Sequence, residues 1–322
     1  MGRFKQIDLK KVTTVNLDDR RNKVAVDAFG RTPPPDGARE FFDSLPDFLQ
    51  ATRLREFITL IKKARDKKQP CHFMMGAHVI KVGLSKIIID LMENDILTGI
   101  SLNSAGLIHD LEMATIGHTS EDVQSGLNDG SFGMAGETAR HFAAVIETAA
   151  SRQIGLGEAA GIHINRAGAR YAGYSLFAAA DRLDIPATIH LAVGTDIVQQ
   201  HDIFKPGPAA EASFRDFKIL SSILSTADRG GVVVNIGSAV ILPEVFLKAL
   251  TVARNIDGSG DRIVTANFDM FNHYRPCMNV VRRPVNLGGQ GFNFIGHHEI
   301  MIPLLAWGLK SNIGRNKNRK GV

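Results

Sequence analysis

The stretch Cys71–Gly117, CHFMMGAHVIKVGLSKIIIDLMENDILTGISLNSAGLIHDLEMATIG, repeats one pattern twice. A short apolar segment is followed by a turn of small residues and then by a longer segment with helical spacing. We predict strands at 71–75 and 99–102 and a helix after each, with the first helix covering 78–93. Such a βαβα unit is typical of parallel sheets. The turns that follow parallel strands face a ligand crevice in doubly wound sheets, so Gly76 and the turn 103–106 mark the predicted site.

The second half of the chain continues this alternation. Short apolar segments, each followed within a few residues by a helical pattern or a polar turn, predict four more strands at 187–193, 231–236, 263–266 and 292–295. A helix or helix pair is expected before the first strand. We therefore predict an α/β fold: a doubly wound, mainly parallel sheet of six or more strands flanked by helices, in one Rossmann-like domain at 38–310.

The two ends of the chain differ from this domain. Residues 1–37 lack clean periodicity and end in a proline-rich connector, so we interpret them as an N-terminal arm. Residues 311–322 form a basic tail. The net charge of +5 is concentrated at these ends, and we interpret them as solubilising termini; the alternative is contact with nucleic acid or an acidic partner.

Composition sets further limits. The chain has 322 residues, of which 44% are hydrophobic and 22% charged, values typical of a globular protein. Cys71 and Cys277 are too few for a disulfide framework, which favours a reducing compartment. The start of the chain is charged, and no apolar run reaches the ~20 residues that span a bilayer. We expect a cytoplasmic protein with no membrane partner.

Small and polar residues follow nearly every predicted strand, and together they form the candidate site. The turns are Gly76, Asn103-Ser104-Ala105-Gly106, Gly194-Thr195-Asp196, Gly237-Ser238-Ala239, Thr265-Ala266-Asn267 and Gly296-His297-His298. Small residues allow close approach of a ligand, helix starts favour anions, and Asp196 or Asp269 suits ribose hydroxyls. No turn matches the G-x-G-x-x-G fingerprint. We predict a nucleotide site here; the alternative is that the glycines only close tight turns.

The order of these turns resembles that of the deoxyhypusine synthase family. The similar segments are GLIHDLEMATIG, YSLFAAADRLDIPATIHLAVGTD, GGVVVNIGSAV, VTANFD and EIMIPLLA. The resemblance extends roughly from Leu54 to Leu309. It implies a doubly wound NAD-binding fold and a homotetramer with sites at dimer interfaces. It also implies NAD-dependent transfer of an aminobutyl group from spermidine to an amine acceptor, which can be a protein.

The resemblance also implies roles for individual residues. Against the cofactor it places Asn103, Ser104, Gly106, Asp196, Gly237, Ser238, Thr265, Ala266 and Asp269; Gly76 joins these candidates as the turn after the first predicted strand. His109 stands where the family has a glutamate, Asp110 follows it, and His297 falls near a family aspartate. Because each histidine lies at a predicted strand-end turn or helix start, we take His109, Asp110 and His297 as the candidate catalytic residues.

One departure concerns the nucleophile. The family uses a lysine before its last strand to carry the aminobutyl group as an imine. In this chain no lysine occurs between Lys248 and Lys310, and arginine is not nucleophilic. Arg282 and Arg283 occupy that segment instead and would suit an anionic group. A polyamine would need clustered carboxylates, which could be supplied by Asp110, Glu112, Asp196, Asp269 and Glu299.

Three interpretations follow. In the first, the protein transfers an aminobutyl-type group from a polyamine without this lysine. In the second, it is an NAD-dependent enzyme for a different substrate, and Arg282 and Arg283 would suit an anionic one. In the third, it is a non-catalytic relative that binds a nucleotide or a partner protein. Eleven histidines are present, but none has a metal-ligand spacing, so we predict no metal site.

Overall fold

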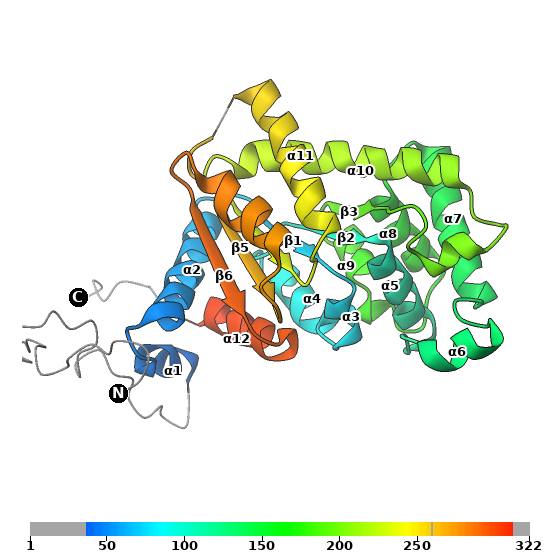
Figure 1. The fold of residues 1–322 in the computed structure, drawn as a ribbon, viewed down its shortest axis with the longest axis horizontal. Coiled ribbons are helices and arrows are strands. Elements are labelled where there is room, and N and C mark those ends of the chain that lie inside the picture. Colours follow the sequence, from blue (N-terminus) through cyan, green and yellow to red (C-terminus); the bar gives the residue numbers. More distant parts are fainter. Residues whose placement is uncertain (1–36, 259, 312–322) are drawn as a thin grey trace, which may run out of the picture.

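The centre of the computed structural model is a six-stranded parallel sheet (Figure 1). The model describes residues 37–258 and 260–311, so nearly all of the predicted arm and tail lie outside the described residues. The strands are β1 (Cys71–Met75), β2 (Gly99–Asn103), β3 (Ala187–His190), β4 (Val232–Ile236), β5 (Val264–Asp269) and β6 (Gln290–Ile295). Every pairing between neighbours is parallel. The predicted fold class is confirmed.

The strand order is β3-β2-β1-β4-β5-β6. The chain therefore winds outward from β1 in one direction, returns to the centre at β4 and winds outward in the other direction. At the centre of the sheet, β1 and β4 pair along their full length, from Cys71 with Val232 to Met75 with Ile236. The carboxyl ends of β1 and β4 form the topological switch point, where ligands bind in open α/β sheets.

Helices cover both faces of the sheet. They are α1 (Ala38–Ser44), α2 (Leu49–Asp66), α3 (His78–Lys81), α4 (Ser85–Glu93), α5 (Ser104–Ile116), α6 (Val123–Asp129), α7 (Gly136–Arg152), α8 (Leu156–Arg166), α9 (Leu176–Arg182), α10 (Pro206–Ala227), α11 (Ile241–Asp257) and α12 (His298–Lys310). Short 3₁₀ turns lie at 172–174, 197–200 and 283–285, and a π-helix at 276–282. In Figure 1, α10 and α11 lie on one side of the sheet and α4 and α12 on the other.

The two faces of the sheet differ in chemistry because side chains alternate along each strand. The face toward α2 and α12 is apolar. There Phe57 of α2 packs against Phe268, Phe292 and Phe294, with ring centroids 5.2–6.0 Å apart. Aromatic pairs at this spacing add to the energy of burial. This face holds the larger core of the protein.

The opposite face carries two rows of hydrogen-bonded polar side chains. Across β4, β5 and β6, the amide of Asn235 donates to Asn267 (2.8 Å), and Asn267 donates to Asn293 (2.9 Å). Across β1, β2 and β3, the row is His72, Ser101, Thr188 and His190, with contacts of 2.6–3.1 Å. Polar rows of this kind specify strand register, because a slip would break these buried hydrogen bonds.

The structure corrects several predicted boundaries. The helix expected at 78–93 is divided into α3 and α4 by Gly83, whose φ is +76°. The glycine-rich segment 119–136 contains a helix that the sequence analysis does not predict, α6. Strand β5 continues to Asp269, so Thr265 and Ala266 lie within the strand and not in a turn. Thr265 and Ala266 are buried within the strand, so the end of the apolar segment did not mark the end of the strand. Within residues 37–258 and 260–311, no helix is both long and apolar enough to cross a membrane.

Candidate functional site

Two glycines meet at the topological switch point. Gly76 follows β1 and donates its N–H to the carbonyl of Ile236 (2.8 Å). A Cβ on Gly76 would lie only 2.3 Å from the carbonyl oxygen of Gly237, which follows β4. Gly237 itself has a φ of +64°. Both positions therefore require glycine, which explains why small residues end these two strands.

The imidazole of His298, the first residue of α12, lies against Gly237. A Cβ on Gly237 would come within 2.6 Å of Cε1 of that ring. The side chain of His298 is 1% exposed, and its Nε2–H donates to the carbonyl of Phe268 at 3.3 Å. The ring of His78 lies edge-on to it, 5.5 Å away. Burial lowers the pKa of His298, while the carbonyl of Phe268 and the charge of Asp269 oppose this effect.

The turn after β2 organises the next part of the site. The side chain of Asn103 accepts a hydrogen bond from the N–H of Gly106 (3.1 Å) and caps α5. The hydroxyl of Ser104 donates to the carboxylate of Asp196, which also accepts from Gln199 at 2.9 Å. Burial raises the pKa of Asp196, and these hydrogen bonds work against the rise. The turns after β2 and β3 are thus joined, as the sequence predicts.

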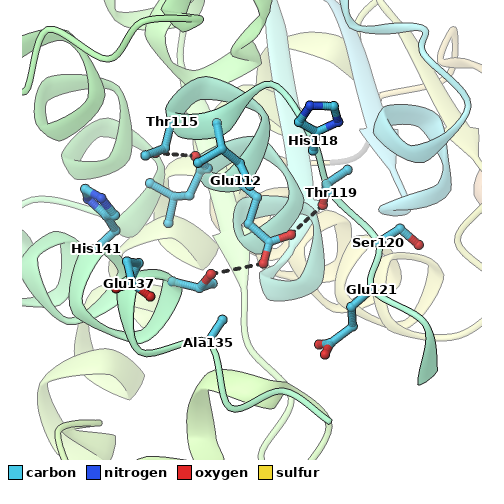
Figure 2. A pocket seen from close by; sticks show the side chains of 12 residues that line it. Glu112, Thr115, His118, Thr119, Ser120, Glu121, Ala135, Glu137 and His141 are labelled. Carbon is cyan, nitrogen blue, oxygen red and sulfur yellow. Dashed lines mark hydrogen bonds between the residues drawn. The ribbon is translucent and has the colours of Figure 1, made fainter. Parts of the chain in front are cut away.

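A cavity of about 490 Å³ opens between the C-terminal half of α5, the segment after it and α7 (Figure 2). Its walls are Leu111, Glu112, Thr115, Ile116, His118, Thr119, Ser120, Glu121, Ala135, Glu137, Thr138 and His141. A smaller cavity of about 180 Å³ shares Glu112, Ser120 and Glu121 with it and reaches Lys81, His109 and Asp196. The two cavities therefore lie on either side of Glu112.

The carboxylate of Glu112 belongs to a short hydrogen-bonded relay. One oxygen accepts from the hydroxyl of Thr138 (3.0 Å) and the other from the hydroxyl of Thr119 (2.5 Å). The Thr119 oxygen lies 2.6 Å from Nδ1 of His109. Because the single hydroxyl proton of Thr119 is directed to Glu112, Nδ1 of His109 must be the donor. Nε2 of His109 then carries the free lone pair.

Electrostatics favour a neutral His109 and a cationic ligand. Burial, with a smaller contribution from the charge of Lys81, lowers the pKa of His109 to about 4. The carboxylates of Glu112, Glu121 and Glu137 line the larger cavity, although Glu137 is well exposed and pairs with Arg140 at 2.8 Å. The apolar parts of the cavity wall can contact the methylene groups of a ligand that carries a charge at each end.

Other predicted residues lie elsewhere. Asp110 is fully buried on the far side of α5, where its carboxylate accepts from the hydroxyl of Ser175 and the N–H of Leu176 (2.8 Å) at the start of α9. Ser238 is also a capping residue, since its hydroxyl accepts from the N–H of Leu242 (3.2 Å). Both side chains therefore stabilise helix starts, which is a common use of aspartate and serine.

The candidate residues for an anion or an amine near the C-terminus are at the surface. Arg282 ends the π-helix, Arg283 begins the 3₁₀ turn that follows, and both are exposed; Arg283 donates to Asn279 at 2.7 Å. Nδ1 of His297 lies 3.7 Å from the Glu299 carboxylate, and their side chains are 66% and 47% exposed. The structure does not place these four residues in the walls of either cavity.

Glu112 was expected only as one of several carboxylates that could bind a polyamine, and His298 only as part of the candidate turn 296–298; neither was predicted as a catalytic or cofactor-binding residue. Glu112 is in the opening sequence stretch, three residues after His109, and that i, i+3 spacing places both on one side of a helix. His298 directly follows the predicted His297 and is the first residue of α12. The side chain of His298 is buried, whereas that of His297 is exposed. Over residues 37–258 and 260–311, no three potential metal-binding side chains cluster.

Comparison with known proteins adds evidence on the fold. The sequence matches no protein-family model and no curated protein. Among solved structures, a candidate deoxyhypusine synthase from Entamoeba histolytica is similar over 85% of this chain and 93% of its own, with 11% identity and a TM-score of 0.50. Unliganded AgrE is similar over 81% of this chain, with 13% identity and a TM-score of 0.51.

AgrE has also been solved in a ternary complex with ornithine and NAD+, which matches 80% of this chain at 13% identity with a TM-score of 0.50. The chain spans about a third of the length of AgrE, 33% and 32% in the two structures. At these identities the likeness establishes the fold. That fold occurs in a protein seen with NAD+ bound.

Proposed function

We propose that this protein is an NAD-dependent enzyme that acts on a small amine, by aminobutyl-type transfer from a polyamine. The observation that carries the proposal is the relay from Glu112 through Thr119 to His109: Glu112 lies in the walls of both cavities, and His109 lies in the wall of the smaller one, which reaches Asp196 after β3. A carboxylate suits the ammonium group of a substrate. A neutral imidazole with a free Nε2 suits the removal of a proton from it.

The residues at the carboxyl edge fit a dinucleotide. The order of the strands provides a switch point, and Gly76 and Gly237 let the backbone and the His298 ring pack closely there. We propose that the cofactor contacts Gly76, Asn103, Ser104, Gly106, Asp196, Gly237 and Asp269. Thr265 and Ala266 are buried inside β5, and Ser238 accepts a hydrogen bond at the start of α11. These three residues would therefore stabilise the strand and the helix start at the site without contacting the cofactor. Bound NAD+ would accept a hydride from the carbon that carries the amine.

Each residue of the relay has a separate task in this proposal. Glu112 binds the ammonium and keeps Thr119 oriented. Thr119 fixes the tautomer of His109, and His109 accepts at Nε2 the proton that an ammonium must lose before its carbon can give up a hydride. A pKa of about 4 keeps His109 unprotonated at neutral pH. It is therefore a weak base whose proton is readily passed on.

The absence of a lysine before β6 is compatible with direct attack by the acceptor amine on the bound imine. Lys81, on α3, is the lysine that lines the smaller cavity. An alternative function, with an anionic substrate held by Arg282 and Arg283, has less support, because both are exposed and absent from the walls of the cavities.

Calorimetric titration with NAD+, alone and with spermidine, tests the proposal. We expect NAD+ to bind, spermidine to strengthen the binding, and 1,3-diaminopropane to be released on incubation with both. Glu112→Gln should reduce spermidine binding at least tenfold, because a neutral amide cannot neutralise an ammonium. Glu147→Gln, at an exposed position of α7, is the matched control.

The alternatives give different results. Turnover of NAD+ with another metabolite and without diaminopropane would favour a different substrate. Folded protein that takes up no NAD+ would favour a non-catalytic relative. We also propose a homotetramer, and a monomeric mass in light scattering would contradict it.

A further inference from the structure

Two buried acceptors without a donor lie at the carboxyl ends of β4 and β5. His298 is 1% exposed and Asp269 is 5% exposed. Nδ1 of His298 and Oδ2 of Asp269 have no hydrogen-bond partner within the described part of the chain. Buried polar groups are nearly always paired, because an unpaired one costs free energy. Two such groups at one end of a sheet therefore need an explanation.

The hydrogen bonds that these residues do make fix what the free atoms can do. Nε2 of His298 donates to the carbonyl of Phe268, so the neutral ring has its lone pair on Nδ1. Oδ1 of Asp269 accepts from the N–H of Met270 (2.8 Å), which leaves Oδ2 as the second acceptor. Both free atoms thus require a donor that the described residues do not supply.

The surroundings exclude an anion and favour a neutral donor. The carboxylates of Asp269 and Glu299 both act electrostatically on His298, and His78 is the other titratable group that faces it. No lysine or arginine acts on His298 in these contacts. A phosphate would be repelled by two carboxylates. Hydroxyl groups, which donate without carrying charge, match the two acceptors.

The place of the pair in the fold selects the ligand. The His298 ring rests on Gly237, where a Cβ would be 3.4 Å from Nδ1, so the free acceptor lies directly at the switch point between β1 and β4. A dinucleotide crosses a sheet of this order at that point. Its riboses carry vicinal hydroxyls, which present two donors on adjacent carbons.

We propose that Asp269 and His298 together bind the vicinal diol of one ribose of NAD+, with one hydroxyl donating to Oδ2 of Asp269 and the other to Nδ1 of His298. The inference rests on the proposed NAD dependence and assigns a cofactor contact to His298. In this arrangement, the first residue of α12 contacts the cofactor directly. Because α12 follows β6, this contact also links β6 to the switch point, which lies two strands away.

The test measures binding and needs no turnover. Calorimetry with NAD+ and with the two analogues that lack the 2′-hydroxyl of one or the other ribose is performed on the wild type and on variants. His298→Gln retains a polar group at the ε position but loses the one at δ, whereas His298→Asn retains a group at δ. Asp269→Asn is a second variant in case His298→Gln does not fold. Glu147→Gln, at an exposed position of α7, is the control.

We expect one deoxy analogue to bind the wild type about tenfold more weakly than NAD+. His298→Gln should bind NAD+ with that same reduced affinity and should no longer distinguish NAD+ from the analogue, while His298→Asn should recover part of the loss. If the wild type binds NAD+ and the variants at both positions still distinguish the analogue as it does, the inference is wrong and the proposed function stands. If the folded wild type binds no NAD+, the proposed function itself fails.

Discussion

Acidification should destabilise this protein through the histidines of its buried polar row. Burial lowers the pKa of His72 to about 3 and that of His190 to about 4, from the usual 6.5. A folded pKa below the unfolded one means that the folded state binds fewer protons. The stability that these groups contribute is therefore complete above pH 6.5 and is lost as the pH falls toward 4.

The size of the effect follows from linkage. At pH 5, an unfolded histidine is almost fully protonated, whereas a folded one with a pKa of about 4 is about one-tenth protonated. That difference is worth about 2 kcal/mol for His190 at pH 5. Two buried carboxyls act in the opposite direction, because burial raises the pKa of Asp216 to about 8 and that of Asp110 to about 6. The contribution of His190 is therefore measured as the difference between wild type and variant in how the unfolding free energy changes with pH.

Urea denaturation at pH 8 and pH 5 measures it. His190→Gln removes the titrating ring and keeps a polar group near Thr188, which lies 3.1 Å from Nε2 of His190. We expect the change in unfolding free energy between the two pH values to differ by about 2 kcal/mol between wild type and variant. His297→Gln, at an exposed position, should follow the wild type. Parallel pH profiles for wild type and His190→Gln would refute the reasoning.

Three further predictions concern packing. Gly76→Ala should destabilise the protein by ~1–3 kcal/mol, since its Cβ would meet a backbone oxygen at 2.3 Å, whereas Gly207→Ala, with open space around it, should be neutral in thermal unfolding. Asn267→Ala should cost ~2–4 kcal/mol in urea, because it removes two buried amide hydrogen bonds; a cost below ~1 kcal/mol would contradict the register role of the row. Asp110→Ala should cost ~1–2 kcal/mol, because its carboxylate accepts a hydrogen bond at the start of α9. Calorimetry should show unchanged NAD+ binding. A selective loss of binding would indicate that Asp110 belongs to the cofactor site.

The sequence alone determined the alternation of strands and helices and the all-parallel sheet, because these depend on local periodicity and on short connections. It also predicted most of the turns at the sheet edge, although β5 continues past the predicted turn at 265–267 to Asp269. Gly76 and Gly237 are local signals, since only glycine permits so close an approach of two backbones. The predicted link between the turns after β2 and β3 is present as the contact of Ser104 with Asp196.

Only the tertiary structure decided what each polar side chain of the site does. Asp110 and Glu112 are two residues apart on α5, but their different directions from the helix axis place one under the cap of α9 and the other in a cavity wall. His297 and His298 are adjacent, yet one is exposed and the other rests on Gly237. A side chain acquires such a role from residues distant in sequence that pack against it, and local patterns do not contain that information.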